Sequence, residues 1–368
     1  MPTAIAARRV LLPHGWGHDL RVSVHQGVIT AIEPCDTTAT AVDVLAPGFV
    51  DLQVNGVDDV DVASARGADW DRLDALLLAQ GVTTWFPTLV TMPLGAYAAP
   101  LARIAAAIDR PAAETPRPRI AGAHLEGPFL GAAHGAHRDE LVRPVDLAWL
   151  GELPQHVRMV TLGAEQPEAA AATRLLVERG VLVSLGHTKA TDAQLTQAAT
   201  AGASMVTHLF NAMTGLHHRE PGVAAWTLAH STMATSIIAD GVHVHPRMID
   251  LAFRLLGPQR AILVTDAVAW RSGRVGPIGM ELRDGAPRLP DGTLAGSALT
   301  MDRAIVNCIA AGVDAELTLR AASTTPARLA GLTDRGAIEV GRRADLVALD
   351  ERFAVQQVWV AGRATQRA

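Results

Sequence analysis

The sequence predicts an α/β fold: a (β/α)8 TIM-like barrel with a small β-sandwich domain built from both ends of the chain. Three observations indicate this fold. Apolar runs of strand type alternate with helical runs across the middle, both ends are rich in short β-type segments, and polar side chains follow several of the apolar runs. We expect residues 1–46 and 336–368 to form the split small domain and residues 47–335 to form the barrel.

The two ends of the chain share the same pattern of short strands and turns. Residues 20–32 alternate around Gly27, which is typical of a β-hairpin. Near the C-terminus, residues 336–340, 344–349 and 355–360 are apolar or alternate, and glycine or aspartate separates them. Two β-rich ends that flank a different middle indicate one domain whose halves pair in space.

The middle of the chain carries the rhythm of a barrel. Eight runs of strand type lie at residues 48–54, 83–90, 119–125, 158–162, 181–185, 205–207, 235–239 and 261–265. Helical runs lie between them at residues 69–80, 96–108, 167–179, 192–201 and 246–256. A doubly wound open sheet is the alternative, and it requires a Gly-rich phosphate-binding turn after its first strand. Residues 48–56 (GFVDLQVNG) contain no GxGxxG, which favours the barrel.

Composition excludes several functional classes. The chain has 368 residues, 49% of them hydrophobic, and a formal net charge of −5, so it can bury a large core but has no general basic field for nucleic acid. Its apolar runs are shorter than the about 18 residues of a membrane span, and its start does not resemble a signal peptide. Two cysteines, Cys35 and Cys308, make no disulfide scaffold. We therefore expect a cytoplasmic protein with no membrane or nucleic-acid partner.

Polar side chains cluster where six of the predicted strands end. Catalytic residues of barrels lie at the C-terminal ends of their strands, and this joint pattern predicts an active site there. The residues are Asp51, Gln53, Asn55, His124, Glu126, His187, His208, Asn211, Asp240, His243 and Asp266.

Three of these residues form a ligand set for a catalytic divalent metal ion. Glu126, His187 and His208 offer one carboxylate oxygen and two imidazole nitrogens, a combination typical of Zn²⁺ sites that keep a position open for water. Metal-bound water has a pKa of about 7 and is the expected nucleophile. Asp266, after the last strand, is placed to take a proton from that water and pass it to a leaving group. A simple helix N-cap is the alternative role for Asp266.

Ten segments of the sequence carry a resemblance to the amidohydrolase superfamily and, within it, to the N-acetylglucosamine-6-phosphate deacetylase family. HLEGPF, and THLFNAM followed by REPG, are specific to the deacetylase branch, whereas GRRADLVALD indicates only the superfamily. The segments are PGFVDLQVNG (47–56), HLEGPF (124–129), GAH (135–137), SLGHT (184–188), THLFNAM (207–213), REPG (219–222), ADGVHV (239–244), LVTDAV (263–268), TLAGSALTM (293–301) and GRRADLVALD (341–350).

The resemblance implies a role for individual residues. It implies that Glu126, His187 and His208 bind the metal and that Asp266 is the general base and acid. His137 is expected to contact the acetamido group and to stabilise the oxyanion, with Ala136 beside it. Further substrate contacts, to the sugar phosphate or lining the site, are implied for Asn211, Ala212, Arg219, His243, Leu294, Ala295 and Gly296.

One departure from the superfamily pattern concerns the number of metal ions. Most amidohydrolases carry HxH at the end of the first barrel strand, where this chain has Gln53-Val54-Asn55. Glutamine is a weak ligand for transition metals, so we expect one divalent ion per subunit, with Gln53 lining the position of a second. Zn²⁺ is the first choice, and Fe²⁺, Co²⁺ and Mn²⁺ suit the same ligands.

The expected reaction is hydrolysis of N-acetyl-D-glucosamine 6-phosphate to D-glucosamine 6-phosphate and acetate. N-acetylgalactosamine 6-phosphate, or an N-acetyl amino sugar without phosphate, is the alternative substrate. A non-catalytic sugar-phosphate sensor would lack at least one of Glu126, His187, His208 and Asp266, and all four are present. The resemblance also implies a homodimer with Arg219 or neighbouring loops near the interface.

Overall fold

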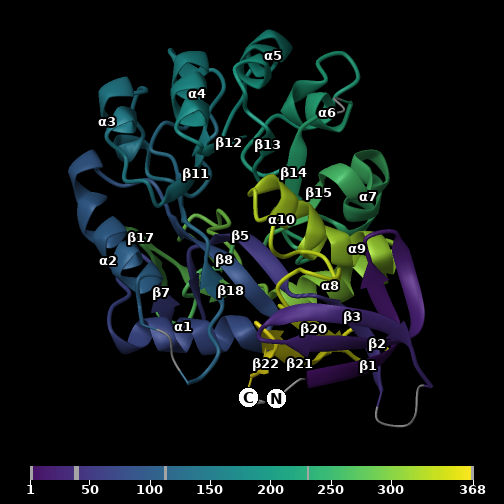
Figure 1. Cartoon of the computed structure of the whole chain (residues 1–368). Helices are drawn as coiled ribbons and strands as arrows, with labels where there is room; N and C mark the ends of the chain where they lie inside the picture. The colour runs from purple at the N-terminus through teal and green to yellow at the C-terminus, as the bar shows by residue number, and fades with distance from the viewer. Residues whose placement is uncertain (1–2, 37–40, 112–113, 230–231, 366–368) are drawn as a thin grey trace.

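A computed structural model describes residues 3–36, 41–111, 114–229 and 232–365 and confirms the barrel. Parallel strands form its wall in the order β15-β14-β13-β12-β11-β10-β8-β5 (Figure 1). The wall closes where Val54 bridges Ala267 and the carbonyl oxygen of Gln53 accepts a hydrogen bond from the Asp266 N–H over 3.0 Å. The strands are β5 (Phe49–Val54), β8 (Val82–Leu89), β10 (Ala123–Glu126), β11 (Val157–Leu162), β12 (Leu182–Leu185), β13 (Met205–Val206), β14 (Ala234–Ile237) and β15 (Ala261–Leu263), with β9 (Arg119–Ile120) beside β8.

Helices surround the barrel and cover its outer surface (Figure 1). The predicted helical runs appear as α1 (Ala68–Ala79), α2 (Ala98–Ile108), α4 (Ala169–Glu178), α5 (Asp192–Thr200) and α7 (Pro246–Arg260). In α2, for example, Leu101, Ile104 and Ala107 recur on one face and are buried. Further short helices complete the layer: α3 (Leu147–Gly151), α6 (Gly222–Ala229), α8 (Met301–Ala310), α9 (Ala315–Ala322) and α10 (Thr324–Leu329), with 3-10 turns at Leu94–Ala96 and Asp139–Leu141.

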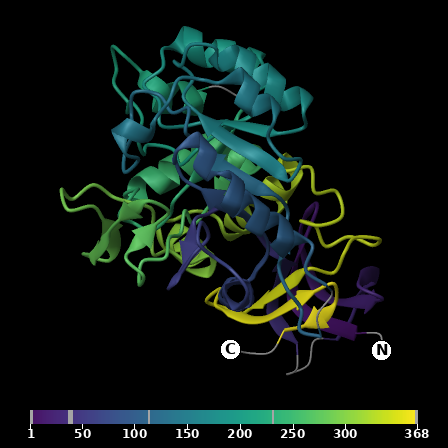
Figure 2. The ribbon, with the colours of Figure 1, turned by 90° about the vertical axis from the view of Figure 1, so that its left-hand side faces the viewer.

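The two ends of the chain pair in space, as predicted, in one mixed sheet below the barrel. Its order is β22-β21-β20-β4-β1-β2-β3, and the antiparallel pairing of β20 with β4 joins the C-terminal strands to the N-terminal ones (Figure 2). The strands are β1 (Thr3–Leu12), β2 (Gly15–His25), β3 (Val28–Pro34), β4 (Val42–Pro47), β20 (Leu346–Leu349), β21 (Val355–Val360) and β22 (Arg363–Ala364).

The predicted small β domain is this one mixed sheet, which curls until its β3 edge meets the segment before β20 and encloses a core of its own. The N–H of Ile29 donates to the carbonyl oxygen of Arg342, and the N–H of Ala344 donates to that of Gly27, which ties the β3 edge to the start of β20. Val10, Val22 and Leu346 are among the side chains buried inside. We keep residues 1–46 and 336–368 as the proposed limits of this domain, of which residues 1–2, 37–40 and 366–368 lie outside the described part.

Small hairpins form a cover at the C-terminal end of the barrel, and they were not predicted. Val275, Ile278 and Met280 from these hairpins pack with Val90 and Val268 in a separate apolar cluster. The strands involved are β6 (Gly56–Val57), β7 (Val60–Asp61), β16 (Arg274–Val275), β17 (Ile278–Gly279), β18 (Glu281–Arg283) and β19 (Ala286–Arg288). Among the described helices, none combines the length and hydrophobicity needed to cross a bilayer.

Candidate active site

The predicted metal ligands meet at the C-terminal end of the barrel. Glu126 ends β10, whereas His187 and His208 follow β12 and β13. Glu126 Oε1 lies 3.0 Å from His208 Nε2 and 3.3 Å from His187 Nε2, and the two Nε2 atoms are 3.1 Å apart. All three side chains are buried. His187 and His208 lie 61 and 82 positions after Glu126 in the sequence. The fold nevertheless brings the three electron-pair donors to one point.

Strained backbone holds several of these side chains in place. His187, His208 and Asp266 adopt φ values of 50°, 32° and 48°, in the left-handed region that residues other than glycine seldom visit. Such conformations cluster at functional sites, where the surrounding structure enforces them. The turn after each strand thus directs the side chain inward, across the mouth of the barrel.

Hydrogen bonds determine which nitrogen of His187 faces the cluster. His187 Nδ1 lies 3.0 Å from the carbonyl oxygen of Ala133 and donates its proton there. Burial lowers the pKa of this ring to about 4, so the imidazole is neutral at pH 7 and Nε2 keeps its lone pair. This arrangement, in which the outer nitrogen donates to a carbonyl group, is typical of histidines that bind metals.

Electrostatics keep the carboxylate of Glu126 charged although it is buried. Burial alone would raise the pKa of Glu126, but hydrogen bonds from His137 and His208 outweigh it and hold that pKa well below its usual value. The same carboxylate raises the pKa of His208 against the effect of burial. A permanent negative charge in a buried cluster of imidazoles is a suitable environment for a cation.

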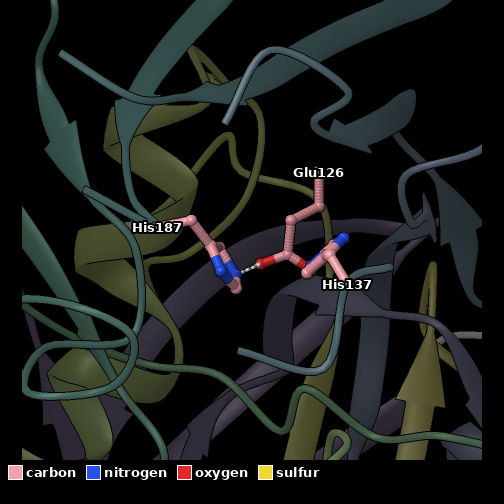
Figure 3. Close-up of side chains that lie close together, drawn as sticks. All are labelled: Glu126, His137 and His187. Atoms are coloured by element: carbon pink, nitrogen blue, oxygen red, sulfur yellow. Dashed lines mark hydrogen bonds and ion pairs between the residues drawn. The ribbon is translucent and has the colours of Figure 1, made fainter. Parts of the chain in front are cut away.

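His137 joins the same cluster. Its Nε2 lies 3.7 Å from Glu126 Oε2, and its ring packs edge-on against His187 with centroids 4.4 Å apart. Figure 3 shows Glu126, His137 and His187 converging, and one donor atom from each lies within 4.8 Å of the others. The hydroxyl group of Thr91, 2.8 Å from His137 Nδ1, fixes the ring. His137 is therefore close enough to act on anything that binds beside the metal ligands.

Asp266 lies across the mouth from the histidines, next to the side-chain amides of Gln53 in β5 and of Asn55 directly after it. Asn55 Nδ2 and Gln53 Nε2 donate to Asp266 Oδ1 over 2.7 and 3.0 Å. Burial and the nearby carboxylate of Glu126 raise the pKa of Asp266 to about 8. Within the described chain, Asp266 Oδ2 has no hydrogen-bond partner, so one oxygen is held and the other is available for proton exchange.

A cavity of about 430 Å³ opens over this cluster. Its volume suits a small ligand such as a sugar phosphate. Predicted residues in its wall are Glu126, Ala136, His137, His187, His208, Asn211, Ala212, His243, Asp266, Leu294, Ala295 and Gly296. Gln53 lies beneath, fully buried, with Nε2 2.9 Å from Glu126 Oε1.

The loop at 294–296 requires a glycine to reach the cavity. Gly296 has a φ of 64°, and a Cβ there would lie 2.3 Å from a methyl carbon of Val268 and 2.9 Å from the carbonyl oxygen of Asp266. Only a residue without a side chain allows the loop to pass so close to Asp266. Leu294 and Ala295 are thereby held in the wall of the cavity.

Two arginines differ from the predicted arrangement. Arg219 is exposed on the loop before α6 and is absent from the described wall of this cavity, so its predicted phosphate contact stays a prediction. Arg288, at the end of β19, is the cation that lines the cavity among the described residues. Its Nη1 donates to the carbonyl oxygen of Gly292 over 2.8 Å. Its Nε is buried and has no hydrogen-bond partner among the described residues. Its position five residues before the predicted loop 293–301 is the one sequence signal that could have found it.

His243 is presented to the cavity by a neighbouring carboxylate. Asp240 Oδ2 lies 2.7 Å from His243 Nδ1, and Oδ1 accepts the backbone N–H of His243 over the same distance. Burial would raise the pKa of Asp240, but these hydrogen bonds lower it. The carboxylate fixes the ring, so that Nε2 is the nitrogen left to meet a ligand.

Comparison with known proteins agrees with this geometry. Residues 44–365 match the amidohydrolase family, and residues 2–45 match the N-terminal domain of formimidoylglutamate deiminase. The chain belongs to the amidohydrolase family. The buried cluster of glutamate and histidine is therefore found in a member of a family of hydrolases. The individual relatives that match this chain indicate a narrower class of enzymes.

Relatives of this amidohydrolase are deacetylases of amino-sugar phosphates. It is 38% identical to N-acetylgalactosamine-6-phosphate deacetylase from Escherichia coli O157:H7, over 99% of both chains. It is 35% identical to N-acetylglucosamine-6-phosphate deacetylase from Vibrio furnissii, over 97% of this chain and 93% of the other. The structure of that enzyme from Thermotoga maritima superposes with a TM-score of 0.91 at 30% identity, covering both chains fully. The Mycobacterium smegmatis enzyme, solved as an Asp-to-Ala variant with N-acetyl-D-glucosamine 6-phosphate, gives 0.90 at 32% identity over 99% of both chains.

Proposed function

We propose that this amidohydrolase removes the acetyl group of N-acetyl-D-glucosamine 6-phosphate, giving D-glucosamine 6-phosphate and acetate. The observation that supports this most directly is the buried convergence of Glu126, His187 and His208 opposite Asp266, in a cavity of sugar-phosphate size. Relatives with this activity cover nearly the whole chain.

The donor set fits one divalent ion. Ligand atoms at 2.0–2.1 Å from a tetrahedral ion are about 3.3 Å apart, and the three donor atoms here are 3.0–3.3 Å apart. We propose Glu126, His187 and His208 as the ligands and Zn²⁺ as the ion, with Fe²⁺, Co²⁺ or Mn²⁺ as substitutes. When bound, such an ion polarises the amide carbonyl and lowers the pKa of water.

A second ion finds no suitable ligands at the end of β5. The Gln53 amide nitrogen donates to both Glu126 and Asp266, so a hydrogen-bond donor takes the place of a lone pair. Asn55 likewise presents Nδ2 to Asp266. We therefore propose a single ion per subunit.

Asp266 moves the proton in the proposed reaction. As a carboxylate, its free Oδ2 accepts a proton from the attacking water, and Asp266 then delivers it to the amide nitrogen. This delivery is necessary because an amine anion is too basic to leave. Asn55 and Gln53, bound to Oδ1, keep the carboxyl group oriented through both steps. His137, fixed by Thr91, donates a hydrogen bond to the oxyanion that develops on the acetyl carbonyl.

The rest of the cavity is proposed to hold the sugar and its phosphate. Asn211, Ala212, His243 and Arg288 line it away from the metal ligands, and the guanidinium of Arg288 suits a phosphate oxygen. Arg219 is exposed outside the cavity of its own chain. We propose a homodimer with the exposed loop around Arg219 near the interface, to be tested by sedimentation of the wild-type protein and Arg219→Glu.

N-acetyl-D-galactosamine 6-phosphate is a second candidate substrate. The 38% identity to a deacetylase of that sugar favours it. Acetate release should be measured with both phosphorylated sugars and with free N-acetylglucosamine, using zinc-loaded protein. Fast release from the gluco sugar alone supports the proposal, and faster release from the galacto sugar replaces it. Equal release from the free sugar overturns the phosphate site, and no release from any overturns the proposed activity.

A further inference from the structure

A second cavity lies at the opposite end of the barrel from the active site. It has a volume of about 540 Å³, and its lining residues come from the N-terminal ends of barrel strands and from the terminal sheet. Arg119 at the start of β9 and Arg158 near the start of β11 come from the barrel. Arg343 and Arg363 come from the terminal sheet region. The cavity therefore joins two parts of the molecule, a common position for ligand sites.

The described wall of this second cavity is strongly basic, although the chain as a whole is acidic. It contains the side chains Arg110, Arg117, Arg119, Arg158, Arg343 and Arg363, together with His156, and no aspartate or glutamate. The net charge of the whole chain is −5, so this local excess of cations opposes the overall balance. Burial lowers the pKa of His156, and the positive charge at neutral pH comes from the arginines.

Carboxylates behind the wall neutralise only part of this charge. Arg110 and Arg117 share Asp74, with Nη2 of Arg110 2.8 Å and Nε of Arg117 3.6 Å from its Oδ2. Arg343 Nε lies 2.9 Å from Asp345 Oδ1. These three arginines are largely structural.

Arg119 and Arg158 are different. In the described chain, neither guanidinium forms an ion pair or a hydrogen bond, and both are exposed toward the cavity. The stem of Arg158 is nevertheless held in place. Gly122 has a φ of 156°, and a Cβ there would lie 2.2 Å from Arg158 Cγ, so the side chain lies across a position that only glycine leaves open.

The cavity is also lined by apolar side chains. Ile108, Pro116, Pro118, Ile120 and Val360 line it. A ligand here meets both guanidinium groups and apolar side chains. The guanidinium group of arginine donates two parallel hydrogen bonds to phosphate oxygens. Several guanidinium groups around one cavity therefore suit a ligand with more than one phosphate group.

We propose that this cavity binds a diphosphate group, free or as part of a nucleotide whose base packs on the apolar side chains that line the cavity. Arg119 and Arg158 supply guanidinium groups that form no hydrogen bond and no ion pair within 4 Å in the described chain, although Arg119 is close enough to Asp334 to lower the pKa of that carboxyl group. Arg363 lines the cavity from the terminal sheet. The site is remote from Asp266 and the metal ligands, so ligand binding can be measured independently of deacetylation.

Isothermal titration of the full chain with inorganic pyrophosphate and with ADP tests this. The double variant Arg119→Ala/Arg158→Ala should weaken binding at least tenfold. The matched control Arg174→Ala/Arg303→Ala removes the same charge from exposed helix positions on α4 and α8 and should bind as the wild type does. Tighter binding of ADP than of pyrophosphate indicates a nucleotide, and equal binding indicates the diphosphate group alone.

Three outcomes would overturn the proposal. Wild-type protein that binds neither probe at millimolar concentration has no such site. If Arg119→Ala/Arg158→Ala and Arg174→Ala/Arg303→Ala weaken the binding of the probe equally, the anion is attracted by the general charge of the protein and not by this cavity. Loss of binding in His243→Ala but not in Arg119→Ala/Arg158→Ala would place the anion in the catalytic cavity instead.

Discussion

The side-chain amide of Gln53 donates a hydrogen bond to Glu126 Oε1 over 2.9 Å. The same nitrogen lies 3.0 Å from Asp266 Oδ1, so one neutral amide connects the proposed metal ligand with the proposed proton carrier. Gln53 is fully buried at the end of the first barrel strand. We propose that this position limits the site to one cation.

Metal content tests the role of Gln53. Zinc-loaded wild-type protein should contain one ion per chain by elemental analysis, because an amide donor is a poor ligand. Gln53→Glu introduces a carboxylate beside Glu126 and Asp266 and should raise the content toward two, since a second cation relieves the repulsion of like charges. Gln53→Asn, which keeps the amide, should stay at one. Two ions in the wild-type protein would contradict the single-ion site.

Asp266→Asn should abolish most of the activity without removing the metal. The amide keeps the shape of the side chain but cannot accept the proton of water, so kcat for acetate release should fall about a thousandfold or more. Metal content should remain one ion per chain. Asp291→Asn, an exposed aspartate beside the cavity loop, is the control and should retain full activity. Wild-type turnover in Asp266→Asn would leave Asp266 as a structural residue.

Arg288 should decide the preference for phosphorylated sugars. Arg288→Ala removes the cation from the wall of the cavity, so KM for the phosphorylated sugar should rise about tenfold or more while kcat changes little. KM for the free sugar should not change. Arg283→Ala, on the same hairpin but outside the cavity wall, is the matched control. An equal increase of KM for both sugars would indicate that Arg288 only supports the hairpin.

Asp51 should make the stability of the metal-free protein depend on pH. Burial raises the pKa of Asp51 from 3.8 to about 7, although the Thr265 hydroxyl donates to Oδ2 over 2.6 Å. Because the folded-state pKa is raised, its contribution to stability is complete below about pH 4 and is lost as the pH rises through 7. The shift corresponds to about 4 kcal/mol of unfolding free energy.

Urea unfolding of the wild-type protein and Asp51→Asn from pH 4 to pH 8 measures this contribution. The asparagine variant does not titrate, so its stability relative to the wild type should increase across this range by a few kcal/mol. Titration of other groups is common to both proteins and cancels in the difference. A difference that does not vary with pH would show that Asp51 is ionised throughout.

The sequence by itself determined the barrel and the candidate chemistry. Eight apolar runs separated by helical runs can bury their strands in few other ways, and a barrel brings all strand ends to one mouth. That topology is why Glu126, His187, His208 and Asp266 could be grouped from their places after strands. The fold therefore determines the position of a side chain at the end of a strand.

Only the tertiary structure decided what depends on loops and on contacts between distant segments. The hairpins of residues 274–288 have no strong periodicity, so neither the cover of the cavity nor Arg288 in its wall was predicted. Arg219 carries the family motif but lies outside the cavity of its own chain, because a loop places its residues by packing and not by register. The basic cavity also required the structure, since Arg158 and Arg363 meet there from segments about 200 residues apart.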